Sequence, residues 1–233
     1  MRQWSLILLM LITVNGKAQG NKEVLLHMAK TGNSISDFIP KGYDTLGIAT
    51  GDLNNDGRKD LAIVLYNLHE ESNGQDYDTN AVSNINRILI ILFKTKLGWN
   101  LVGRSGSLIL CNNCGGTNAI NGYPIDPFSD IKIQNGTLII SENGGLEKWG
   151  ITLRFKFLKD DFYLVGKTNI SESKHWCEKL KKYQEETITI NFLTGERKKR
   201  QISDDCKELA DIDDKIEVKP LIKLADFNVD SNN

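Results

Sequence analysis

Alternation of apolar and polar residues is the main structural signal along this chain. Segments with a period of two are rich in β-branched and aromatic residues, which is typical of half-buried β-strands. Turn sequences such as NDG, QNG, KDD and LTG separate these segments. The pattern therefore predicts a mainly β, antiparallel protein. The predicted strands are Thr45–Thr50, Leu61–Tyr66, Ile88–Lys94, Trp99–Arg104, Ile131–Gln134, Thr137–Ser141, Ile151–Phe157, Phe162–Thr168 and Thr187–Phe192.

Two segments carry helical patterns instead. Asn21–Ala29 is expected to form a short helix, and Ser173–Glu186 has a helix-forming composition. The second segment places three apolar residues at helical spacing, namely Trp176, Leu180 and Tyr183. Side chains two positions apart do not face each other on a helix. His175 and Cys177 are therefore not expected to act as a catalytic pair.

The chain contains one internal repeat. The segment ILIILFKTKLGWNLVGRS at 88–105 resembles GITLRFKFLKDDFYLVGKT at 150–168, and a further predicted hairpin precedes each copy. Each unit thus has about four antiparallel strands, the size of one propeller blade. Two units cannot close a ring of four or more blades. We therefore expect two packed, blade-like four-stranded sheets, an incomplete propeller, with residues 187–202 adding a further hairpin.

The chain is predicted to have five parts. They are a signal peptide at 1–18, a first β unit at 37–105, a long loop at 106–130, a second β unit at 131–202 and a polar C-terminal tail at 203–233. The loops at 67–86 and 106–130 are long and polar, so they are the expected mobile or binding regions. The end of the tail is expected to fray.

The N-terminal residues have the pattern of a secretory signal peptide. Arg2 precedes an apolar run from Trp4 to Val14, and the small residues Gly16 and Ala18 precede a cleavage site. The run is shorter than the ~20 apolar residues that span a bilayer. A buried N-terminal helix or strand is the alternative. The pattern predicts a secreted or periplasmic protein, cleaved near Ala18.

The charge of the chain argues against a nucleic-acid partner. The net charge is −1, and it becomes −3 when Arg2 and Lys17 leave with the signal peptide. Nucleic-acid binding calls for a basic patch, whereas the basic run Arg197–Arg200 is short and is expected on a solvated strand or turn. No other apolar run is long enough to span a membrane.

Four cysteines remain after cleavage: Cys111, Cys114, Cys177 and Cys206. An even number in an exported chain favours disulfides, and four cysteines allow three pairings. The sequence does not choose among them, although proximity favours Cys111–Cys114 and Cys177–Cys206. Zinc binding and thiol exchange are the alternatives for the CxxC motif. A zinc site made of all four thiolates would need a more closely spaced second pair.

The sharpest motif is the aspartate loop DLNNDGRKD at residues 52–60. Oxygen-bearing side chains occupy its positions 1, 3, 5 and 9, and a glycine occupies position 6. Ca²⁺ takes six to eight hard oxygen ligands, and zinc or copper prefers nitrogen and sulfur. Gly57 permits the positive φ that reverses the chain. The predicted calcium ligands are Asp52, Asn54, Asp56, the Arg58 carbonyl and Asp60.

The loop differs from an EF-hand. Position 12 is Ile63 rather than a bidentate glutamate, and the flanking sequences are strand-like rather than helical. We expect a strand–loop–strand arrangement in which Leu61 and Ile63 enter the sheet directly. The alternative is a metal-free turn stabilised by the side chains of Asn54 and Asp56.

GDLNNDGRKDLAIVL resembles the FG-GAP or VCBS repeat of integrin-type propellers and secreted bacterial proteins. FIPKGYDTLGIATGDLNNDGRKDLAIVL, RILIILFK, WGITLRFKFLKDDFYLVGKT and ITINFLTGERKK resemble a group of exported bacterial proteins of unassigned function, over residues 37–200. The repeat family implies calcium ligation by Asp52, Asn54, Asp56 and Asp60, with Arg58 at the carbonyl position. The second unit has only QNG at the corresponding place.

These features predict an exported, calcium-stabilised β-domain protein that acts by binding. Its histidines are scattered, and GxSxG, HExxH and phosphate-binding glycine motifs are absent from the sequence. The expected partner is an envelope glycan or protein. The alternative is a secreted hydrolase with a site built from loops 67–86 and 106–130. Convergent acids beside an aromatic platform in those loops would favour the enzyme.

Overall fold

The computed structural model describes residues 19–70, 86–118, 120, 122–145, 148–203, 205–209 and 211–229. The N-terminal part is helix α1 (Gln19–His27), strand β1 (Thr31–Gly32) and the short 3₁₀ helix η1 (Ile35–Phe38). Four strands follow: β2 (Tyr43–Gly51), β3 (Asp60–Asn67), β4 (Arg87–Lys94) and β5 (Trp99–Ile109). The remaining strands are β6 (Phe128–Gln134), β7 (Thr137–Gly144), β8 (Trp149–Leu158), β9 (Asp161–Cys177), β10 (Lys182–Asn191), β11 (Glu196–Gln201) and β12 (Ile212–Lys215).

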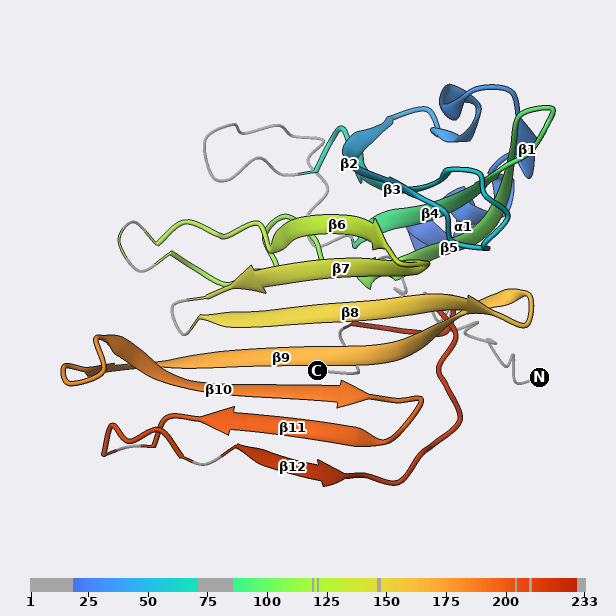
Figure 1. Ribbon diagram of the computed structural model, residues 1–233. Helices are drawn as coiled ribbons and strands as arrows, with labels where there is room; N and C mark the ends of the chain where they lie inside the picture. The colour runs from blue at the N-terminus through green and yellow to red at the C-terminus, as the bar shows by residue number, and fades with distance from the viewer. Residues whose placement is uncertain are drawn as a thin grey trace, which may run out of the picture.

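These strands form two antiparallel sheets. The first has five strands in the order β1-β5-β4-β3-β2, and the second has seven in the order β12-β11-β10-β9-β8-β7-β6. The strands β6 to β12 follow one another in chain order, with the first sheet at the β6 end (Figure 1). The expectation of a mainly β protein with packed antiparallel sheets is confirmed. In the second sheet, β6 to β9 form the expected four-stranded unit, β10 and β11 correspond to the further hairpin expected at 187–202, and β12 adds one strand that was not expected.

Every predicted strand overlaps an observed one. The loop predicted at 106–130, however, is shorter than expected. β5 continues to Ile109 and β6 begins at Phe128, so the connection covers 110–127 rather than 106–130. The predicted helix at 21–29 corresponds to α1. The predicted signal peptide at 1–18 and residues 71–85 of the first long loop lie outside the described residues. No described helix has the length and apolar character needed to cross a membrane.

The predicted helix at Ser173–Glu186 is wrong, because this segment is the end of the β9–β10 hairpin. Trp176 pairs with Tyr183 across the two strands, and their rings meet edge to face with centroids 5.0 Å apart. Cross-strand aromatic pairing and continuation of an existing ladder thus override a local helical preference. This difference matters for His175 and Cys177. Residues two positions apart can lie side by side on a strand, whereas on a helix they do not face each other.

The core has two layers, one on each side of the first sheet. Ala62, Val64, Leu89 and Ile91 pack toward the second sheet, in one cluster with Phe155 and Phe162. The alternate residues of the same strands pack on the other face with α1 and η1, among them Ile63, Leu65, Ile88 and Ile90. Burial on both faces explains why β3 and β4 are almost continuously apolar.

The C-terminal tail does not fray over its described residues. Leu224, Phe227 and Val229 are buried with at most 1% of their surface exposed. The chain after β12 returns to β9, where the Leu224 N–H donates to the Phe162 carbonyl over 2.8 Å. Further along, the Val229 N–H donates to the Ser107 carbonyl over 3.0 Å. Up to residue 229 the expectation that the tail frays is wrong, because its apolar residues are part of the core cluster between the sheets.

Candidate calcium site

The aspartate loop connects β2 to β3 and is anchored at both ends. Gly51 and Asp60 face each other as the last pair of the β2–β3 ladder. Leu53 is 1% exposed and belongs to the core between the two sheets. Leu61 and Ile63 are buried in β3, as the strand–loop–strand prediction requires. The loop is therefore fixed to the sheet on both sides while its central residues stay near the surface.

Side-chain oxygens of the loop accept hydrogen bonds from its own backbone. Asp52 accepts from the N–H groups of Asp56 and Gly57 over 3.2 and 2.8 Å. Asn54 accepts from the Asp56 N–H over 3.1 Å, and Asp56 accepts from the Arg58 N–H over 2.8 Å. Gly57 has a φ of +81°, as the motif predicts. These hydrogen bonds coil the loop around its side-chain oxygens.

Asp60 has a different environment from the other predicted ligands. Its side chain is fully buried and accepts from the N–H groups of Leu53 and Lys94 over 2.9 and 3.0 Å. Burial raises the pKa of Asp60, the two hydrogen bonds lower it, and the carboxylates of Asp56 and Asp52 raise it further. Asp60 thus connects the loop to β4, and the negative charges of Asp52 and Asp56 raise its pKa.

The three carboxylates are close but not gathered around one point. They do not form a group whose ligand atoms all lie within 4.8 Å of one another among the described residues. The Asp56 carboxylate also lies 3.7 Å from the Arg58 guanidinium, with both side chains partly exposed. Each carboxylate has about four lone-pair positions, so an oxygen that accepts an N–H can still bind a cation. Calcium binding here would require the side chains of the predicted ligands to turn toward one point.

The loop lies against the turn that joins β6 to β7. A Cβ atom at Gly136 would be 3.6 Å from the side-chain oxygen of Asn55 and 3.9 Å from the Asp52 carbonyl. At Gly51, a Cβ would be 2.4 Å from the Ile133 side chain. The aspartate loop of the first unit thus meets the QNG turn of the second unit. Sequence alone did not indicate this contact, because the two segments are about 80 residues apart.

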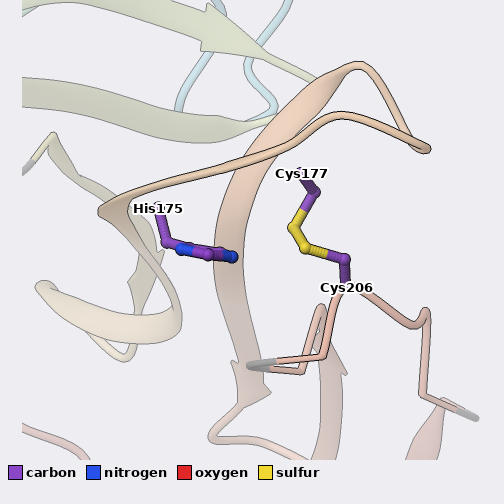
Figure 2. Close-up of side chains that lie close together, drawn as sticks. All are labelled: His175, Cys177 and Cys206. Carbon is purple, nitrogen blue, oxygen red and sulfur yellow. A yellow bond between two sulfur atoms is a disulfide. The ribbon is translucent and has the colours of Figure 1, made fainter.

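Both disulfides follow the pairing that proximity favours, Cys111–Cys114 and Cys177–Cys206. The second bridge lies beside His175. One ring nitrogen of His175 and the two sulfur atoms are all within 4.8 Å of one another. Figure 2 shows the imidazole pointing toward the disulfide. The pattern HWC did contain a signal for this arrangement, but it is visible only when the segment is read as a strand.

Arg87 joins the two loops that were expected to build a hydrolase site. Its side chain is 2% exposed and forms ion pairs with Glu70 and Asp126 at 2.8 and 2.7 Å. Burial alone would lower the pKa of Arg87, but the hydrogen bonds with Asp126 and Glu70 raise it instead. These two acids are therefore neutralised by a cation. In the described part of these loops, Arg87 therefore holds Glu70 and Asp126 together, and these three residues form the Arg87 clamp.

A groove of about 670 Å³ lies between the 110–114 segment and strands β8 to β10. Its wall includes Trp149, Asn169, Ser171 and Glu186. Glu186 forms an ion pair with Lys199 of β11. An aromatic ring beside amide, hydroxyl and carboxylate groups is suited to a polar ligand with apolar faces.

Searches against protein-family models, curated proteins and solved structures found no match for this chain. The resemblance to FG-GAP and VCBS repeats thus stays a prediction from the loop motif.

Proposed function

We propose that this is an exported protein that calcium stabilises and that acts by binding an envelope glycan. The aspartate loop carries the proposal. Four side chains with oxygen ligands alternate along a loop that is already coiled, and a hard divalent cation would relieve the repulsion among its three carboxylates. Two disulfides are compatible with an oxidising compartment.

Calcium would act as a structural element at the junction of the two sheets. Asn55 and the Asp52 carbonyl of the loop lie close to Gly136 in the β6–β7 turn, while Leu53 is part of the shared core. A bound ion would order the exposed part of the loop and hold both contacts together. This supports a stabilising role rather than a catalytic one.

Calcium is expected to raise the melting temperature of the mature protein. A ligand that binds only the folded state at 100 times its dissociation constant adds about 2.7 kcal/mol to the unfolding free energy. The Asp56→Ala variant should lose calcium binding and the calcium-dependent shift. The Asp160→Ala variant, in the β8–β9 turn, should keep both. Calcium binding would be contradicted if chelation leaves the melting temperature unchanged and calorimetry detects no heat of calcium binding. The loop would then be a metal-free Asx turn.

The groove beside Trp149 is the proposed glycan-binding surface. Sugar rings stack on aromatic faces, and Asn169, Ser171 and Glu186 can bind the hydroxyl groups. A glycan array should retain the protein, and Trp149→Ala should lose at least tenfold in affinity. Because Trp149 also packs against the core, Asn169→Ala provides a second variant at an exposed position. Trp176→Ala, an exposed tryptophan outside the groove, is the matched control.

Retention that is equal in the wild type, Trp149→Ala and Asn169→Ala would contradict the assignment of this groove. The hydrolase alternative has less support, because Glu70 and Asp126 are engaged by Arg87. Release of reducing sugar from the retained glycan would support the hydrolase alternative.

A further inference from the structure

The cluster of His175, Cys177 and Cys206 is separate from the calcium loop and has different ligand chemistry. His175 and Cys177 lie near the end of β9, Cys206 comes from the turn after β11, and their ligand atoms are close together. The Cα atoms of the two cysteines are 5.3 Å apart. His175 is exposed, Cys206 is half-buried and Cys177 is buried. The cluster is thus buried on the side of Cys177 and open to solvent on the side of the His175 imidazole.

We propose that reduction of the Cys177–Cys206 disulfide converts this cluster into a binding site for zinc or a similar thiophilic metal ion. An extracytoplasmic dithiol would supply the two electrons. Its two thiols become a disulfide while the protein disulfide becomes two thiols. Zn²⁺ then displaces one proton from each cysteine and binds both thiolates and the neutral imidazole. Two thiolates balance the charge of the ion, and water completes four-coordination.

The distances suit this conversion. Zinc lies about 2.3 Å from sulfur and about 2.0–2.1 Å from imidazole nitrogen. Ligand atoms around a tetrahedral zinc are therefore roughly 3.3–3.8 Å apart. The three ligand atoms are already within 4.8 Å of one another, so the sulfurs separate and the imidazole moves in by only about an ångström. No backbone element has to move far, because both cysteines are held at the end of one hairpin and its neighbouring turn.

The metal would restore the cross-link that reduction removes. The disulfide joins residues 29 positions apart, and it ties the tip of the β9–β10 hairpin to the turn after β11. A zinc ion on the same two sulfurs closes the same loop. The protein would then have two cross-linked forms, an oxidised one without metal and a reduced one with metal. Among the described residues this is the single group of three His, Cys, Asp or Glu side chains gathered this closely.

The test is zinc binding by the mature protein before and after reduction with a phosphine, without oxygen, in competition with a chromogenic chelator. The oxidised protein should leave the chelator signal unchanged, and the reduced protein should bind one equivalent. Cobalt should give a sulfur-to-metal charge-transfer band in the reduced form. The His175→Ala variant should lose at least tenfold in zinc affinity. His27→Ala, an exposed histidine at the end of α1, should behave like the wild type.

The remaining variants assign the binding to one cysteine pair. The Cys111→Ser/Cys114→Ser double variant should keep the site, and Cys177→Ser/Cys206→Ser should lose it. If Cys177→Ser/Cys206→Ser fails to fold, Cys111→Ser/Cys114→Ser and His175→Ala still show which residues bind zinc. Zinc binding that needs Cys111 and Cys114, or that is unchanged in His175→Ala, would overturn the proposal. So would a reduced protein that leaves the chelator signal unchanged. Calcium titrations of the aspartate loop have a separate readout, so either proposal can fail alone.

Discussion

Two buried charged residues show how single side chains determine the local structure. Asp60 is fully buried and meets backbone N–H groups, whereas Arg87 is almost fully buried and meets two carboxylates. A buried charge without such partners would cost several kcal/mol. Both residues lie at the first position of a strand, so each ties a strand to a loop. Their partners lie from 7 to 39 residues away in the sequence.

Replacing Arg87 by alanine is expected to destabilise the protein by about 3–5 kcal/mol. The change leaves the carboxylates of Glu70 and Asp126 close together without their cation, and it also releases the 110–127 loop from the end of β3. Urea unfolding followed by tryptophan fluorescence measures the loss. The Arg87→Met/Glu70→Gln/Asp126→Asn variant should recover part of it, because no uncompensated charge remains.

Arg197→Ala is the matched control for this clamp. Arg197 also makes two hydrogen bonds to one carboxylate, that of Asp214, but both side chains are well exposed. Exposed ion pairs contribute little because water and salt screen them. The control should therefore change the unfolding midpoint far less than Arg87→Ala. Equal losses in the two variants would contradict the role assigned to burial.

At the scale of elements, local pattern was most reliable where one face of a strand is buried and the other is polar. In β8 the apolar residues Ile151, Leu153 and Phe155 are buried and the polar residues between them are half-exposed. The pattern was insufficient at Ser173–Glu186. Its Glu, Lys and Leu residues favour a helix, but Trp176 and Tyr183 also match a cross-strand pair on a hairpin. The neighbouring ladder of β9 and β10 decided between the two.

The aspartate loop is an element whose shape was largely predictable. Short-range hydrogen bonds between its side chains and its backbone depend only on residues a few positions apart. The positive φ at Gly57 followed from the motif in the same way. The burial of Asp60 did not, because the Lys94 N–H that it binds belongs to a different strand.

At the scale of the whole molecule, the C-terminal tail completes the core between the sheets. Phe227 is 1% exposed and meets Phe155 edge to face, with ring centroids 6.1 Å apart. The Phe227 carbonyl accepts a hydrogen bond from the Ser107 hydroxyl over 2.8 Å. The last described residues of the chain therefore pack onto the end of β5, far from their neighbours in sequence.

Phe227→Ala is expected to lower the unfolding free energy by about 3–5 kcal/mol, because it removes a large buried ring and leaves a cavity. Thermal or urea unfolding measures the change. Val218→Ala is the control from the same C-terminal segment, since Val218 is 56% exposed. It should change stability by at most about 0.5 kcal/mol. A tail that frays would show no difference between the two variants.

The sequence by itself determined the approximate positions of strands β2 to β10, the motif of the aspartate loop and the favoured cysteine pairs. These features depend on periodicity and on contacts between residues close in the chain. The tertiary structure decided the extension of the second sheet, the clamp at Arg87, the burial of the tail and the meeting of His175 with Cys177 and Cys206. A strand's own residues specify which face is apolar, but they do not specify which edge or apolar surface will be available to it. That depends on the rest of the chain, because burial free energy is shared among segments that come together only on folding.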